Sequence, residues 1–134
     1  MNLSIHLDFN GDCEEAFAFY ASELGGRIES MLHAAPSPDT SQESRCRRVV
    51  HASLFVGGMR LAGADVEQQA YQPPRGFHLL LNVDTAERVH ALFYALQAGG
   101  QAVLAPQRTF WSSCYAIVVD RFGVSWKLNC VLSA

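Results

Sequence analysis

The stretch Phe77-His78-Leu79-Leu80-Leu81-Asn82-Val83-Asp84 has a pattern that the chain uses once before, near its start. The earlier copy is Ile5-His6-Leu7-Asp8-Phe9-Asn10-Gly11-Asp12. In each copy a His is followed by apolar residues at alternate positions, then by Asn, Asp and a helical pattern. A glycine pair ends that pattern, Gly25-Gly26 in one copy and Gly99-Gly100 in the other. This self-similarity indicates an internal duplication, so two similar modules are expected.

Length and composition restrict the class of protein. A chain of 134 residues is typical of one domain and buries enough surface for a core without metals or disulfides. A net charge of -3 gives no reason to expect nucleic acid or an anionic membrane as a partner. The four cysteines lack paired spacing, and no signal peptide or long apolar run is visible. These features predict a cytoplasmic setting.

The first module reads as strand, helix, strand, strand, strand. Residues 3–9 alternate between apolar and polar, which is typical of a half-buried strand. Asp12 stands three residues before Glu15, which predicts a helix start of the capping-box type, and Gly25 predicts a left-handed helix stop. Residues 34–44 are predicted to form a polar loop. The cluster Arg45-Cys46-Arg47-Arg48 is interpreted as a solvated edge, with binding of a phosphate or carboxylate as the alternative. Further strands are expected at 27–32, 49–56 and 59–65, with a turn at Gly57-Gly58.

The second module repeats this order after a connection at residues 66–75. Asp84 stands three residues before Glu87, which predicts a second helix start, and Gly99-Gly100 ends the helical pattern. Strands are expected at 101–110, 114–120 and 124–131. Two βαβββ modules, at about 1–66 and 76–134, predict an α+β fold of cupped mixed sheets with the helices on the outer face.

The face of each sheet away from its helix is expected to be open. Strand parity places six polar residues there: His6, Asp8, His51, His78, Asn82 and Lys127. When the modules are aligned on Gly58 and Gly123, Leu61 corresponds to Trp126 and Ala62 to Lys127. Trp126 is therefore expected in the core.

Several motifs match one family across nearly the whole chain. They are Phe9-Asn10-Gly11-Asp12-Cys13-Glu14-Glu15-Ala16-Phe17, Phe19-Tyr20, His51-Ala52, Gly57-Gly58, Thr109-Phe110-Trp111 and Asp120-Arg121-Phe122-Gly123-Val124-Ser125-Trp126. The chain resembles the PhnB-like branch of the vicinal oxygen chelate superfamily, which includes glyoxalase I, fosfomycin-resistance proteins, extradiol dioxygenases and bleomycin-resistance proteins. The resemblance implies one domain over residues 1–134 and a homodimer. Members are often labelled demethylubiquinone methyltransferase-like, but the sequence has no Gly-rich loop for S-adenosylmethionine.

The resemblance also implies a divalent metal held by His and Glu on the first and last strands of each module. His78 matches the second metal His, and His6 corresponds to it by internal repetition. The two carboxylate positions fall on Ala62 and Lys127. Alanine has no ligand atom in its side chain, and lysine cannot bind a metal while it is protonated. No tightly bound metal or other cofactor is therefore predicted. If a divalent metal is present, His6 and His78 are the expected ligands.

The candidate site residues have two interpretations each. His6 and His78 are candidates for acid–base work, or they are strand histidines that hydrogen-bond within the sheet. Lys127 polarises a substrate oxygen or holds a carboxylate; alternatively it pairs with Asp8 or faces solvent. The expected ligand contacts are Asp8, His51, Phe55, Leu80 and Trp111. For Trp111 the alternatives are a dimer contact or simple packing.

Two classes of function remain open from the sequence. The first is a small-molecule-handling protein, similar to glyoxalase and bleomycin-resistance proteins, with a ligand cavity in the sheet concavity but without the full metal site. The second is a metal-dependent lyase, isomerase or dioxygenase of the same superfamily that acts on a small oxygen-bearing substrate. The sequence does not decide whether the protein is an enzyme.

Overall fold

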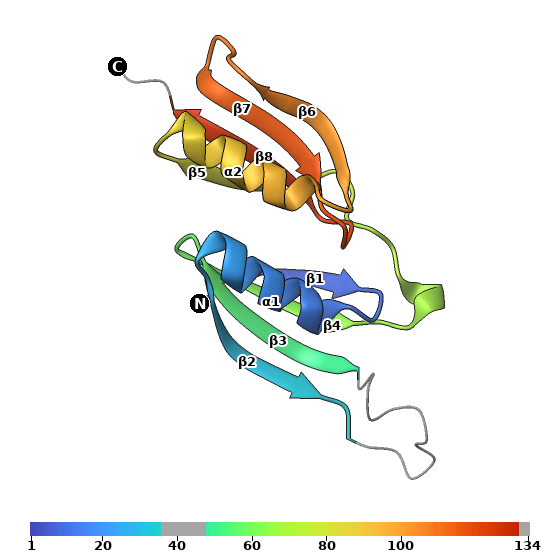
Figure 1. Ribbon diagram of the computed structural model, residues 1–134. Coiled ribbons are helices and arrows are strands. Elements are labelled where there is room, and N and C mark those ends of the chain that lie inside the picture. Colours follow the sequence, from blue (N-terminus) through green and yellow to red (C-terminus); the bar gives the residue numbers. More distant parts are fainter. Residues whose placement is uncertain (36–47, 132–134) are drawn as a thin grey trace. The chain divides into compact units, whose positions relative to one another are not determined.

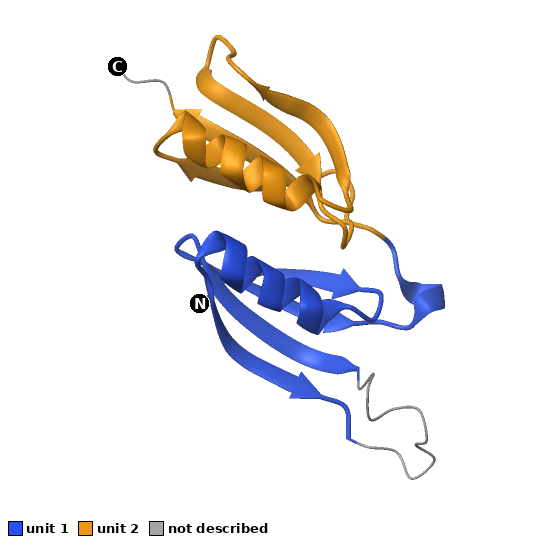
Figure 2. Cartoon of the chain, in the orientation of Figure 1, with its two compact units in different colours: residues 1–72 blue, residues 73–134 orange. Residues whose placement is uncertain are grey.

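The computed structural model describes residues 1–35 and 48–131 (Figure 1). The chain divides into two compact units, Met1–Gln72 and Pro73–Ala134 (Figure 2). These units correspond to the two predicted modules. Most of the predicted loop at 34–44 and three of the four residues from Arg45 to Arg48 lie outside the described residues.

Unit 1 contains one helix and a four-stranded sheet with strand order β1-β4-β3-β2. Strand β1 runs parallel to β4, and the other neighbours are antiparallel, so the sheet is mixed as predicted. A 3-10 turn, η1 (Gln68–Ala70), follows the last strand. The elements are β1 (Ile5–Phe9), α1 (Cys13–Leu24), β2 (Arg27–His33), β3 (Val49–Val56) and β4 (Met59–Asp65).

Unit 2 repeats this topology with strand order β5-β8-β7-β6. Strand β5 runs parallel to β8, and the remaining pairs are antiparallel. The elements are β5 (Leu79–Val83), α2 (Ala86–Gln97), β6 (Gln101–Gln107), β7 (Ser112–Val119) and β8 (Ser125–Val131). The predicted α+β fold of two βαβββ modules is therefore confirmed.

Strand register changes the correspondence between the two copies. His6 pairs with Ala62, whereas Lys127, the counterpart of Ala62, pairs with Leu80. The structural counterpart of His6 is therefore Leu80, and the expected match with His78 is shifted by two residues. The second helix is capped one residue later than expected, and the link between the first strand and the helix is one residue shorter in unit 2.

Both helix starts differ from the predicted capping boxes. Asp12 is the N-cap residue of α1 but makes no side-chain capping bond. Instead, the backbone N–H of Cys13 donates to Oδ1 of Asp65 at 2.9 Å. In α2 the N-cap is Thr85, whose Oγ1 accepts a bond from the backbone N–H of Arg88 at 3.1 Å. The predicted start of α1 at Asp12 was therefore correct but its capping bond was not, and the prediction of Asp84 as the cap of α2 was wrong.

Each helix covers one face of its own sheet (Figure 1), and the core of each unit lies between that helix and that sheet. In unit 1 the rings of Phe9 and Phe17 meet edge to face, 5.7 Å apart, above Gly63. In unit 2 Trp126 is almost fully buried, as predicted, and its Nε1 donates to Oδ2 of Asp120 at 2.8 Å.

Burial along the strands distinguishes the two faces of each sheet. In β1 the residues Leu7 and Phe9 are buried, whereas His6 and Asp8 between them are exposed. Strand β8 alternates in the same way, with Trp126 and Leu128 on the buried side. No described helix of the same unit covers the other side. We call this side the open face of each unit.

Candidate functional site

The open face of unit 1 carries four of the predicted site residues. His6 and Asp8 are about half exposed, and Nδ1 of His6 lies 3.5 Å from Oδ1 of Asp8. His51 and Phe55 lie on the same face of β3, and both are exposed. The placement of these residues agrees with strand parity, and their roles stay predictions.

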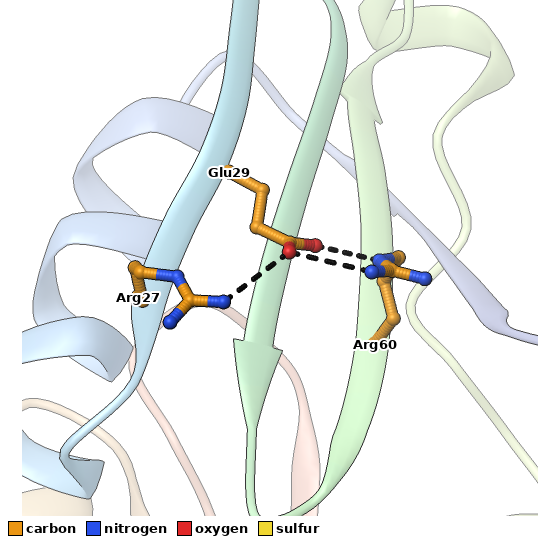
Figure 3. Close-up of polar contacts among 3 residues, drawn as sticks. All are labelled: Arg27, Glu29 and Arg60. Atoms are coloured by element: carbon orange, nitrogen blue, oxygen red, sulfur yellow. Dashed lines mark hydrogen bonds and ion pairs between the residues drawn. The ribbon is translucent and has the colours of Figure 1, made fainter.

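A second group on this face comes from β2 and β4 (Figure 3). Nε of Arg60 donates to Oε1 of Glu29 at 2.6 Å, and Nη2 of Arg60 donates to Oε2 at 3.3 Å. Nη2 of Arg27 lies 3.5 Å from the same Oε2. Glu29 occupies a register irregularity in β2, which brings it level with both arginines.

Electrostatics in this group favour the charged forms. The hydrogen bond from Arg60 holds the pKa of Glu29 below its usual range, and Arg27 adds to the effect. The guanidinium of Arg27 also lies over the ring of Phe55, 5.7 Å from its centroid. The group therefore keeps one net positive charge beside an aromatic ring. Sequence reasoning missed it, although its arginines flank a Phe already placed on the open face.

Small side chains lie between the group of Arg27, Glu29 and Arg60 and the strand that carries His6. Ala62 pairs with His6 on one side and with Ser53 on the other. No carboxylate therefore lies across the sheet from His6 within this row.

Lys127 is the central charged residue on the open face of unit 2 and the only lysine in the chain. It is half-buried in β8, and its register partners are Leu80 on β5 and Ile117 on β7. Among the residues that the structure describes, Lys127 has no ion pair or hydrogen bond. Its register partners on both neighbouring strands therefore carry aliphatic side chains, and no described residue supplies a counter-charge to it.

His78 lies just before β5, beside the same strand as Lys127. Its Nδ1 is 2.6 Å from Oγ of Ser125, which stands two residues before Lys127 in β8. This contact is the within-sheet hydrogen bond that the structural interpretation of His78 requires. It also fixes the ring on one edge of the open face.

Amides and aromatic rings flank Lys127 further along the sheet. Nδ2 of Asn129 donates to Oδ1 of Asn82 at 2.9 Å, and Tyr115 pairs with Asn129 across the strands. The ring of Trp111 meets that of Tyr115 at 5.4 Å, and Phe110 meets Trp111 at 4.8 Å. Trp111 is 50% exposed. Asn129 and Tyr115 were missed, although parity with Lys127 predicts both positions.

A shallow depression adjoins this row of amides. It has a volume of about 460 Å³ and lies where β5 ends and α2 begins. The residues that line it are Asn82, Val83, Asp84, Thr85 and Arg88. Asn82 therefore belongs both to the open face and to the depression.

The residues do not fit the metal site that the resemblance implies. Over residues 1–35 and 48–131, no three His, Cys, Asp or Glu side chains gather closely enough to hold an ion. Ala62 and Lys127 occupy the positions that should carry carboxylates, and a protonated lysine repels a cation. The shifted register also removes the equivalence of His6 and His78.

Comparison with known proteins identifies relatives over the full length of the chain. A family model described as 3-demethylubiquinone-9 3-methyltransferase matches residues 1–129. Protein YjdN from Escherichia coli K12 is 30% identical over 141 residues, covering 98% of this chain and 96% of that protein. Protein PA1353 from Pseudomonas aeruginosa is 35% identical, with a TM-score of 0.85 and 99% of both chains covered.

More distant solved structures share the fold. A putative 3-demethylubiquinone-9 3-methyltransferase from Bacillus cereus, described as PhnB protein, is 24% identical with a TM-score of 0.81, covering 98% of this chain and 100% of that chain. A glyoxalase/bleomycin resistance protein/dioxygenase family enzyme from Burkholderia phytofirmans is 21% identical with a TM-score of 0.68, covering 98% and 100%. In the described parts of the chain, no helix has the length and apolar character needed to cross a membrane. The chain therefore belongs to the 3-demethylubiquinone-9 3-methyltransferase family, the PhnB-like branch predicted from its motifs, and has the fold of the vicinal oxygen chelate superfamily.

Proposed function

We propose that the protein binds a small organic molecule on the open face of unit 2 and that it does so without the full superfamily metal site. Lys127 supplies the charge in this site. Leu80 is its register partner on β5, and His78 and Trp111 are further predicted contacts on the same unit. Open-face residues of unit 1, namely His6, Asp8, His51 and Phe55, remain predicted ligand contacts.

One observation carries the proposal. Lys127 is half-buried between Leu80 and Ile117, and it has no partner among the described residues. An ammonium that has no carboxylate partner is available to a bound anion. The aliphatic side chains of its register partners favour an anion that also carries an apolar body.

A thermal-shift screen of metal ions and small metabolites tests the proposal. A ligand at a hundred times its dissociation constant adds about 2.7 kcal/mol to the free energy of unfolding. We expect hits among organic anions, and the shift they cause should be lost in Lys127→Met.

A matched variant controls for net charge. Arg75 is exposed and lies in the same unit, outside the strands. Arg75→Met should leave both the stability and the ligand-induced shift unchanged. If no compound in the screen gives a shift that depends on Lys127, the proposed function is wrong.

The metal part of the proposal has its own test. Protein purified without chelators or metal-affinity resin should contain far less than one zinc, nickel, manganese or iron per chain. Lys127→Glu restores a carboxylate at the superfamily position and should increase binding of divalent ions. A stoichiometric metal that is lost in His78→Ala would instead favour the metal-dependent lyase, isomerase or dioxygenase.

We also propose a cytoplasmic homodimer. The described cysteines, Cys13, Cys114 and Cys130, are unpaired and buried, which is consistent with a reducing compartment. Apolar side chains on unit 2, among them Leu80 and Val131, are more than half exposed and are available to a second copy. Sedimentation that shows only monomer at micromolar concentration would contradict the dimer and leave ligand binding unaffected.

A further inference from the structure

We infer that the ligand of unit 2 is an aromatic carboxylate, with its carboxylate on Lys127 and its ring against Tyr115 and Trp111. This inference rests on the proposed function and specifies the class of ligand. It is drawn from three features of the open face: the type of cation, the side chains beside it and the position of the aromatic rings.

The cation favours a single negative charge. Lysine presents one compact ammonium, whereas phosphate groups are usually held by several donors or by the planar fork of arginine. The neighbours of Lys127 within its row are Leu80 and Ile117, and neither can donate a hydrogen bond to an oxyanion. One ammonium is matched in charge by one carboxylate. A dianion would need a second cation, and neither register partner of Lys127 supplies one.

The aliphatic neighbours require an apolar body next to that carboxylate. Leu80 is 55% exposed on the edge strand β5, directly beside Lys127. Burying its side chain against a ligand contributes about 25 cal/mol for each Å² of apolar surface removed from water. A fully polar anion would remove no apolar surface of its own from water here.

The aromatic rings determine where this body lies. Lys127 and Asn129 are two residues apart on β8, and Tyr115 is the partner of Asn129 on β7. From strand geometry, the backbone positions of Lys127 and Tyr115 are on the order of 8 Å apart. A carboxylate joined to one or two rings spans this separation. Trp111 and Tyr115 then provide a T-shaped pair against which a flat ring packs.

The two tryptophans of the chain differ in their surroundings, and only Trp111 is accessible to a ligand. Trp126 is in the core and its indole N–H is bonded to Asp120. Trp111 is half-exposed, with its rings held by Phe110 and Tyr115. An exposed aromatic cluster on the same unit as a cation that has no partner among the described residues has the chemistry of a receptor for an aromatic anion.

Binding of six probes tests the class of ligand. Indole-3-acetate and benzoate carry both the ring and the carboxylate. Indole lacks the charge, cyclohexanecarboxylate lacks the flat ring, acetate lacks any body, and inorganic phosphate replaces the carboxylate. We expect saturable thermal shifts with the first two, and affinities at least about tenfold weaker for the other four.

The position of the ligand is tested by labelling. Reductive methylation with ¹³C-formaldehyde labels amines only, and Lys127 is the sole lysine, so two signals are expected, one from Lys127 and one from the N-terminus. Indole-3-acetate should shift the Lys127 signal with the same dissociation constant as the thermal titration. The N-terminal signal should not follow that curve.

Variants separate the ring contact from the charge contact. Trp111→Ala should weaken indole-3-acetate about tenfold, and Trp111→Phe should restore most of the affinity. Tyr94→Ala removes an exposed aromatic from α2 and should have no effect. If cyclohexanecarboxylate binds as well as benzoate, or if Trp111→Ala has no effect, the aromatic inference is overturned.

Failure of this inference can be distinguished from failure of the proposed function. If another anion class gives a shift that depends on Lys127 while the aromatic acids do not bind, the proposed function stands and the inference fails. If no probe acts but Lys127→Met alters the monomer–dimer equilibrium, a second copy supplies the counter-charge, and both are overturned.

Discussion

The indole Nε1 of Trp126 donates a hydrogen bond of 2.8 Å to Oδ2 of Asp120, six residues earlier in the β7–β8 hairpin. The other oxygen of Asp120 accepts bonds from the backbone N–H groups of Phe122 and Val124, at 2.9 and 3.0 Å. One buried carboxylate thus connects the turn to the core. Both residues belong to the motif from which the family was predicted.

Asp120→Ala is expected to lower the free energy of unfolding by about 3 kcal/mol, because three buried donors lose their acceptor. Asp120→Asn should cost less, since its oxygen still accepts from the two amides while its NH₂ faces the indole N–H. In a Trp126→Phe background, which removes that N–H, the cost of Asp120→Asn should fall. Urea unfolding of the four proteins measures the coupling, and equal costs in both backgrounds would show that the indole bond contributes nothing.

Gly63 is expected to resist even the smallest substitution. A Cβ at this position would lie 2.8 Å from Cζ of Phe17 and 3.1 Å from Cε2 of Phe9. Because this core is filled, Gly63→Ala should cost about 1–3 kcal/mol despite the backbone entropy that alanine saves. Phe17→Leu makes room, so the alanine should cost less in that background by at least about 1 kcal/mol. An additive double variant in denaturant unfolding would contradict this packing.

Asp12 is expected to destabilise the protein at neutral pH. Burial raises the pKa of its carboxyl above the usual 3.8, and repulsion from Asp65 and Glu15 adds to this. Its Oδ1 is buried, and no group of the described residues donates a hydrogen bond to it. A raised folded-state pKa means that folding favours the protonated form. The resulting stabilisation is fully present below pH 3.8 and is lost as pH rises through the folded pKa.

Asp12→Asn should therefore raise the free energy of unfolding at pH 7 on the order of 0.5 kcal/mol, allowing for solvent screening. The difference should vanish below pH 3.8, where both side chains are uncharged. Asp84→Asn, at an exposed carboxyl, is the control and should show no comparable gain. Chemical unfolding at pH 3.5 and pH 7 provides the comparison, and a loss of stability in Asp12→Asn at pH 7 would contradict the prediction.

Cys13 is expected to be an unreactive thiol in the folded protein. Burial raises its pKa from 9.0 to about 12, and the Asp65 carboxylate adds to the effect. In a Cys46→Ser variant, only the three described thiols remain, and all are buried. Ellman's reagent at pH 8 should then react only after denaturation. The raised pKa also means that stability is lost as pH rises from 9 toward 12, and Cys13→Ala should reduce this alkaline loss.

Most of the fold followed from local patterns. The glycine pair Gly57-Gly58 predicted the turn between Val56 and Met59, and both glycines have the positive φ angles that such a turn requires. Alternation along the last strand predicted that Trp126 lies in the core. The cap of α2 is local, because Thr85 accepts from Arg88 three residues later. The acceptor for Cys13 could not be predicted, because it is Asp65, which lies 52 residues away. Such partners are defined by strand register and not by spacing.

The candidate site was predicted as a set of positions but not as a set of partners. Parity placed Lys127 and His6 correctly on open faces, since it depends only on counting along a strand. The repeat alignment failed for His78, because a strand slides by two residues without changing the face that its side chains occupy. The Arg27–Glu29–Arg60 group depends on a register irregularity in β2 that no periodic pattern reveals.

The carboxylate of Asp65 has a consequence for how the first unit opens. It accepts bonds from the N–H groups of Cys13 and Val49, both at 2.9 Å, at the start of α1 and of β3. Amides at the ends of elements usually exchange with solvent by fraying, independently of one another. Here one side chain from the end of β4 holds both. We expect the two amides to share a single slow hydrogen–deuterium exchange rate, so that two distant element ends behave as one cooperative opening unit.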